Sequence, residues 1–147
     1  MRFQTIRLLG AAALCSVLLC GCGAQYKDGT YEAKSSPYEG NPAENEPAGD
    51  YGIVRITVQG GAVTDCAYEM YNADGSIKDE NYGKENGEIA DQDVYNMAQK
   101  AIGAGQECVR KFLQNGKTED VDAISGATTA CKQFVEAADL ALAQAKK

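Results

Sequence analysis

The sequence YGIVRITVQGGAVTDCAYEMY, residues 51–71, limits the fold of this 147-residue chain more narrowly than any other stretch. Apolar and polar residues alternate on both sides of Gln59-Gly60-Gly61. This pattern predicts two half-buried strands joined by a tight turn as a β-hairpin. The residues expected on the buried face of this hairpin are Val54, Ile56, Val58, Cys66, Tyr68 and Met70.

After the hairpin, the period of the apolar residues changes from two to 3.6, which predicts a helix. Residues 72–87 are polar, contain glycine and are expected to form a loop. Asp91 can cap a helix that runs to about Leu113, and Asn115-Gly116 ends it. Residues 121–124 are expected to form a short strand. The apolar stripe of the helix is expected to be Val94, Ala98, Ala101 or Ile102, Cys108 or Val109, and Phe112.

A second helix is expected at the C-terminus, over about residues 129–145. Residues 130–146 are rich in alanine and contain neither glycine nor proline. Their apolar stripe is Phe134, Ala138, Ala141 or Leu142, and Ala145. The hairpin and the two helices together predict an α+β fold, in which a small antiparallel sheet packs with two main helices in a single domain.

The chain before the hairpin contributes a strand and a long connection. Residues 26–31, YKDGTY, are expected to form a turn that enters a short strand. Residues 34–50 contain all three prolines with glycine, asparagine and serine, and are expected to form a mobile loop. About 100 residues remain outside this loop and the leader, which supports one small core. We therefore expect one domain over residues 26–147.

The first 21 residues have the features of a targeting segment. Arg2 and Arg7 precede an apolar run, residues 8–19, which is too short to span a bilayer. Leu19-Cys20-Gly21-Cys22 resembles the lipobox of bacterial lipoproteins. The resemblance implies cleavage after Gly21, lipidation of Cys22 and a short tether over residues 22–25. The mature protein would then be anchored to the cell membrane and face away from the cytoplasm. The alternative is an ordinary signal peptide that contains cysteines.

The charge and the composition exclude several classes of function. Loss of residues 1–21 would leave 12 basic and 21 acidic residues, a net charge of −9, so no nucleic-acid partner is expected. The chain has no histidine, which excludes c-type haem attachment and His-based acid–base chemistry. Cys66, Cys108 and Cys131 are far apart and odd in number, so at most one disulfide and no metal site are expected. Their default role is as small buried hydrophobes.

Residues 122–129, DAISGATT, place hydroxyl groups behind two small residues at the expected start of the C-terminal helix. The free N–H groups and the dipole of a helix N-terminus favour a phosphate there. Lys132 lies one turn beyond Thr128 and can offset the charge of that phosphate. From these residues alone, Thr128 can also be an N-cap that follows a turn of small residues.

Ser125-Gly126-Ala127-Thr128, with Asp122 three residues before the serine, resembles the covalent flavin-attachment motif of the FMN-binding domain family. That family includes the flavin-bearing subunits of sodium-translocating NADH:quinone oxidoreductase and of Rnf-type complexes. The resemblance implies FMN as the cofactor, joined by a flavin transferase to Thr128 through its phosphate. Many members carry serine or threonine where Ala130 stands here. The cofactor-binding residues that the resemblance implies are Asp122, Ser125, Gly126, Ala127, Thr128, Thr129 and Lys132.

These features lead to one main functional hypothesis and two alternatives. The main hypothesis is a lipid-anchored flavoprotein that carries electrons between redox partners in the membrane or envelope. The alternatives are a lipoprotein that binds FMN or another small ligand non-covalently, and a structural envelope module. No constellation for substrate turnover is present, so an electron carrier is favoured over an enzyme. The tyrosines that can stack on a flavin, or simply pack, are Tyr68, Tyr71, Tyr82 and Tyr95.

Overall fold

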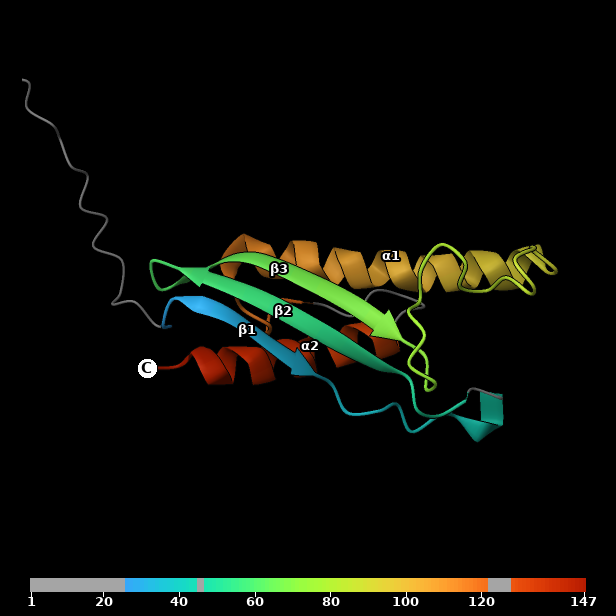
Figure 1. The fold of residues 1–147 in the computed structure, drawn as a ribbon, viewed down its shortest axis with the longest axis horizontal. Helices are drawn as coiled ribbons and strands as arrows, with labels where there is room; N and C mark the ends of the chain where they lie inside the picture. Colours follow the sequence, from blue (N-terminus) through green and yellow to red (C-terminus); the bar gives the residue numbers. More distant parts are fainter. Residues whose placement is uncertain (1–25, 45–46, 122–127) are drawn as a thin grey trace, which may run out of the picture.

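The computed structural model describes residues 26–44, 47–121 and 128–147, and it has the predicted α+β fold (Figure 1). Three antiparallel strands form one sheet in the order β1-β2-β3, and two helices pack against it. The predicted leader, Cys22 and residues 122–127 of the motif lie outside the described residues. The elements are β1 (Gly29–Lys34), the 3-10 turn η1 (Pro42–Glu44), β2 (Tyr51–Gln59), β3 (Ala62–Tyr71), α1 (Gln92–Asn115) and α2 (Thr128–Ala145).

The predicted hairpin and its buried face are confirmed. Val54 pairs with Tyr68 and Ile56 with Cys66, and all four side chains are buried. Gly60 and Gly61 both have positive φ, 62° and 78°, which explains why two glycines stand at the turn.

The entry into β1 holds this turn in place. Asp28 Oδ1 accepts a hydrogen bond of 2.9 Å from the Gly61 N–H. Hydrogen bonds from the backbone of Gly61 and Gly60 lower the pKa of the Asp28 carboxyl. The turn predicted before the first strand therefore caps a second turn, 33 residues further along the chain.

Both helices cover the same face of the sheet, and the core lies between the two layers. In Figure 1, α1 runs beside β3 while α2 lies under β1 and β2. Phe112 of α1 and Phe134 of α2 are fully buried, and their rings meet edge to face with centroids 5.7 Å apart. The other face of the sheet is polar, and there the exposed Arg55 pairs with Glu32.

Helix α1 begins and ends where its capping residues predict, but its first half is less buried than its apolar stripe predicts. Asp91 caps it by accepting hydrogen bonds from the Asp93 and Val94 N–H groups. Its last residue is Asn115, two residues beyond the predicted Leu113, and Gly116, with φ 70°, caps it. The assignment of Val94 to the buried stripe was wrong, because its side chain is 49% exposed. The first half of α1 extends past the end of the sheet (Figure 1), so no strand covers it.

Close contacts fix the second half of α1 against the sheet and α2. Gly105 lies so near Tyr68 that an added Cβ would be 3.0 Å from the ring. Cys108 and Cys131 form a disulfide that joins α1 to the first turns of α2, with Cα atoms 6.1 Å apart. Cys66 is buried and carries the free thiol among the described cysteines.

Two further predictions concern the regions around α2. The predicted strand at residues 121–124 lies largely outside the described residues, and Val121, which is described, is buried outside any strand. The stripe predicted for α2 is confirmed, since its five residues are buried: Phe134, Ala138, Ala141, Leu142 and Ala145.

Neither helix of the described residues is long and apolar enough to cross a membrane.

Candidate functional site

A cavity of about 870 Å³ opens at the N-terminal end of α2. Its walls come from five parts of the chain that the fold brings together: the described residues between Ser36 and Asp50, the start of β2, the end of β3 with the loop that follows, the middle of α1, and the first turns of α2. A cavity of this size is within the range that holds a drug-sized ligand or a cofactor.

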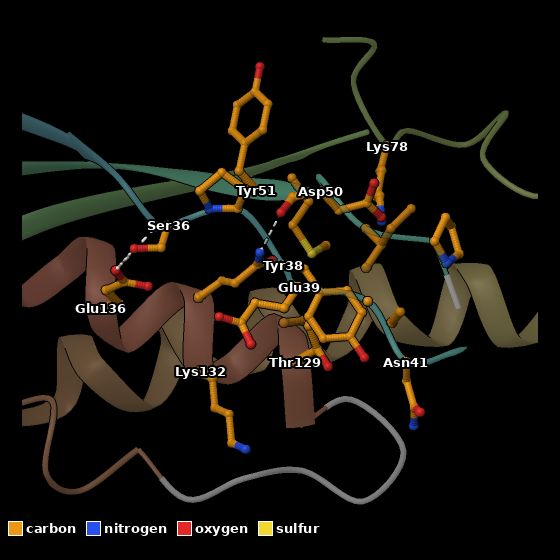
Figure 2. A pocket seen from close by; sticks show the side chains of 18 of the residues that line it. Ser36, Tyr38, Glu39, Asn41, Asp50, Tyr51, Lys78, Thr129, Lys132 and Glu136 are labelled. Carbon is orange, nitrogen blue, oxygen red and sulfur yellow. Dashed lines mark hydrogen bonds and ion pairs between the residues drawn. The ribbon is translucent and has the colours of Figure 1, made fainter. Parts of the chain in front are cut away.

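The proline-rich segment, which the sequence predicted as a mobile loop, forms one wall of the cavity. Its two ends are joined by hydrogen bonds from Tyr38 N to Asp50 O (2.7 Å) and from Gly49 N to Tyr38 O (2.8 Å). Ser36 donates from its N–H and its hydroxyl to Glu136 of α2, at 3.1 and 2.5 Å (Figure 2). The segment is a loop, as predicted, but it is tied to α2.

Asp50 connects three of the walls. Its backbone oxygen accepts a hydrogen bond of 2.7 Å from Gln133 Nε2 of α2. Its carboxylate accepts from the Ala73 N–H at 3.1 Å and pairs with Lys78 Nζ at 2.5 Å. Figure 2 shows Asp50 and Lys78 beside each other at the sheet end of the cavity, above α2.

Apolar and aromatic side chains also line the cavity. Met70 of β3 and Ala101 and Ile102 of α1 contribute apolar surface. Tyr82 also lines the cavity, and the Lys78 ammonium lies 4.6 Å from its ring centroid. An apolar wall with an aromatic ring and a few fixed polar groups suits a flat, partly polar ring system.

The structure describes three of the predicted site residues, and two of them line this cavity. Thr128 is the first residue of α2, so its backbone stands at the helix N-terminus. Thr129, which is half-buried, and Lys132, which is exposed, line the cavity. Figure 2 shows the Lys132 ammonium extending away from Asp50 and Lys78, on the far side of the helix turn. The other predicted residues, Asp122, Ser125, Gly126 and Ala127, lie outside the described residues.

Of the four tyrosines proposed as stacking partners, Tyr82 alone lines the cavity. Tyr68 is buried in the core, donates a hydrogen bond to Ala130 O (2.9 Å), and has its pKa raised by burial. Tyr71 stacks on Tyr51, with ring centroids 5.2 Å apart, and Tyr95 donates to Glu80 O. These three are packing residues, which was the other interpretation of the sequence.

Sequence reasoning missed Asp50 and Lys78, which no local motif marks. Asp50 ends the proline-rich segment, and Lys78 follows a run of turn residues, so both resemble ordinary solvated charges. Their common position depends on contacts between segments that are 28 residues apart. Within the described part of the chain, no group of cysteine and carboxylate residues could hold a metal ion.

Comparisons with known proteins agree with this geometry. The model of the FMN-binding domain family matches residues 52–143, which include all of α1 and nearly all of α2 and the hairpin. No curated protein matches the chain significantly. The crystal structure of the CPE2226 protein from Clostridium perfringens is similar in fold, with a TM-score of 0.54 and 21% identity over 82% of this chain and 88% of that chain.

The residues at the cavity fit FMN as the cofactor. The apolar and aromatic wall suits the isoalloxazine ring, while the N-terminus of α2 suits a phosphate. When bound, FMN supplies the redox chemistry, and the protein holds and orients it. The family match covers more than half of the chain, and it agrees with the cavity and the fold. This flavin-binding chain therefore belongs to the FMN-binding domain family.

Proposed function

We propose that this protein is a lipid-anchored flavoprotein that carries electrons outside the cytoplasm, with FMN joined to Thr128 through a phosphodiester bond. The observation that carries this proposal is the position of Thr128 as the first residue of α2, next to cavity residues Thr129 and Ala130. A phosphate on Thr128 would lie at the helix N-terminus, where the dipole and the free N–H groups favour negative charge. The attached ring would then have the cavity within reach.

The bond requires an enzyme and an activated flavin nucleotide, because the threonine hydroxyl has to displace a leaving group from phosphorus. A flavin transferase is therefore the first partner that we propose. The residue pattern that it would read is Asp122 with Ser125-Gly126-Ala127-Thr128. A covalent bond suits a protein outside the cytoplasm, where a dissociated cofactor would be lost by dilution.

Electron transfer is favoured over substrate turnover by the polar groups of the cavity. The chain has no histidine, and the free thiol of its described residues, Cys66, is buried in the core rather than in the cavity wall. Lys78 and Asp50 are already paired with each other. The redox partners would be proteins or carriers of the membrane or envelope, reached from a membrane anchor at Cys22.

The test is peptide mass spectrometry on the protein isolated from a host that exports it and has a flavin transferase. The proposal predicts that the peptide containing residues 122–132 carries the mass of FMN minus water on Thr128. The denatured protein should also remain yellow and fluorescent. Flavin released on denaturation would favour the non-covalent ligand-binding lipoprotein, and an unmodified Thr128 in that host would overturn the covalent assignment.

A further inference from the structure

An ion pair lies in the wall of the cavity and is mostly shielded from water. Lys78 Nζ is 2.5 Å from Asp50 Oδ2, and the two side chains are 14% and 19% exposed. Both residues line the cavity. The other carboxylate oxygen accepts the Ala73 N–H, and the ammonium lies over the Tyr82 ring. Each charge is therefore held in position by two partners.

This pair differs from the exposed ion pairs of the described residues. Arg55 and Glu32, on the outer face of the sheet, are 55% and 51% exposed. Such exposed charges are screened by water and salt, whereas charges that are partly withdrawn from water act more strongly on their neighbours. A buried pair also adds little net stability, because desolvation opposes the attraction. We therefore expect the charges of Asp50 and Lys78 to act mainly on the ligand that occupies the cavity.

We propose that Asp50 and Lys78 set the reduction potential of the bound FMN by opposing electrostatic effects. The proposal rests on the proposed function, in which the flavin ring occupies this cavity. When FMN takes two electrons from a reduced electron carrier and one proton from water, it gains one negative charge. A fixed cation in the cavity wall stabilises that product, and a fixed anion destabilises it. Lys78 therefore raises the potential and Asp50 lowers it.

Three substitutions separate charge from structure. Lys78→Met keeps most of the side-chain volume and removes the cation, so the midpoint potential should fall. Asp50→Asn keeps an acceptor for the Ala73 N–H and removes the anion, so the potential should rise. Lys78→Arg keeps the charge, so its midpoint potential should stay close to that of the wild type. A purely structural disturbance would not shift the first two variants in opposite directions.

The matched control is Arg55→Met, which removes a cation of the exposed pair on the outer face of the sheet. It should leave the potential unchanged. Midpoint potentials are measured by reductive titration of the full-length, FMN-loaded protein against reference dyes. Circular dichroism melting of each variant shows whether the fold is retained, and bound flavin is quantified first by absorbance.

The outcomes distinguish this inference from the proposed function. If FMN is bound, covalently or not, and the Lys78 and Asp50 variants do not shift in opposite directions, the inference is overturned and the proposed function is unaffected. A shift in Arg55→Met as large as that in Lys78→Met would also overturn it. If the wild-type chain takes up no FMN in either form, both proposals fail before any potential is measured.

Discussion

Thr128 and Thr129 are adjacent hydroxyl residues with different positions at the start of α2. Thr128 is the first helical residue, whereas Thr129 is half-buried and lines the cavity. We expect Thr128→Ala to abolish in-gel flavin fluorescence, with a loss of stability of at most about 1 kcal/mol if the residue also caps the helix. Thr129→Ala is the matched control and should keep its label. Flavin lost from the Thr129 variant and retained by the Thr128 variant would reverse the assignment.

Cys66 gives a prediction about reactivity and pH. Burial, and to a lesser extent the Asp65 carboxylate, raise the pKa of the Cys66 thiol from its ordinary value of 9.0 to about 12. The native thiol should therefore not react with Ellman's reagent at pH 8, although it should react in guanidinium chloride. Cys66→Ser identifies the thiol, because this variant should lose the reaction in denaturant.

The same shift predicts how stability depends on pH. The unfolded thiol ionises near pH 9.0, while the folded thiol keeps its proton up to about pH 12. The contribution of this proton to stability is complete below pH 9 and is lost as the pH rises toward 12. The free energy of unfolding, measured in urea, should fall over this pH range more steeply for the wild type than for Cys66→Ser. Parallel curves for the two proteins would contradict the role given to Cys66.

At the scale of single residues, the sequence predicted the burial of side chains whose position follows from periodicity. It missed the side chains whose position depends on tertiary contacts. Val54, Ile56 and Val58 alternate with polar residues, and a strand permits only one burial pattern for such alternation. Val94 follows a helical period equally well, yet it is exposed because the helix is longer than the sheet that it covers. Lys78 has no periodic or motif context, so no sequence signal places it in a cavity.

Among the elements, the segment from residue 35 to residue 50 departs most from its predicted character. Its prolines correctly predicted a loop. It is held in place by hydrogen bonds to two side chains of α2. Gln133 bonds to Asp50, 83 residues away in sequence, and Glu136 bonds to Ser36, 100 residues away. Such contacts depend on the finished packing of α2 on β2. They are not encoded by any local pattern.

Gln133 provides a test of this wall. Its amide donates to Asp50 O at 2.7 Å, and its side chain is buried. Gln133→Leu keeps the volume and removes the donor, which should cost about 1 kcal/mol and release the segment from α2. Chymotrypsin should then cleave after Tyr38 faster than in the wild type. The affinity for FMN in a protein without covalent flavin should also fall.

Helix α2 contains a matched control for that experiment. Gln144 donates in the same way to Glu32 O, at 2.9 Å, but it is exposed and distant from the cavity residues. Gln144→Leu should leave both the cleavage after Tyr38 and the affinity for FMN unchanged. Equal effects of the two substitutions would mean that the bond to Asp50 does not hold the wall of the cavity.

On the scale of the whole molecule, α2 runs from the cavity to the start of the described domain. Its first turns border the cavity, and its last residues hold the start of the domain, through the Tyr26–Lys146 bridge and the bond from Lys27 N to Ala145 O. A helix of 18 residues is about 27 Å long. Figure 1 shows the start of β1 next to the C-terminus, at the end of the sheet opposite to the beginning of β2.

The proposed anchor belongs to the end of the molecule that lies away from the cavity. The four residues from Cys22 to Gln25 can extend over at most about 14 Å. If Cys22 carries the lipid, Cys22→Ala should release the exported protein from the membrane into the aqueous phase of a detergent partition. Cys20→Ala is the control and should leave the protein anchored. Unchanged partition of the Cys22 variant would contradict the anchor.

An anchor at that end predicts that the flavin lies far from the bilayer. The mature chain would carry a net charge of −9, so anionic lipid should repel the domain rather than let it lie flat on the surface. In anionic liposomes that contain a headgroup nitroxide lipid, a short-range quencher, flavin fluorescence of the lipidated protein should be unaffected. A fluorophore attached to Lys147→Cys, at the anchored end, should be quenched. Cys66 is buried and should not compete for the label. Quenching of the flavin as strong as that of the label would place the cavity against the membrane and contradict this orientation.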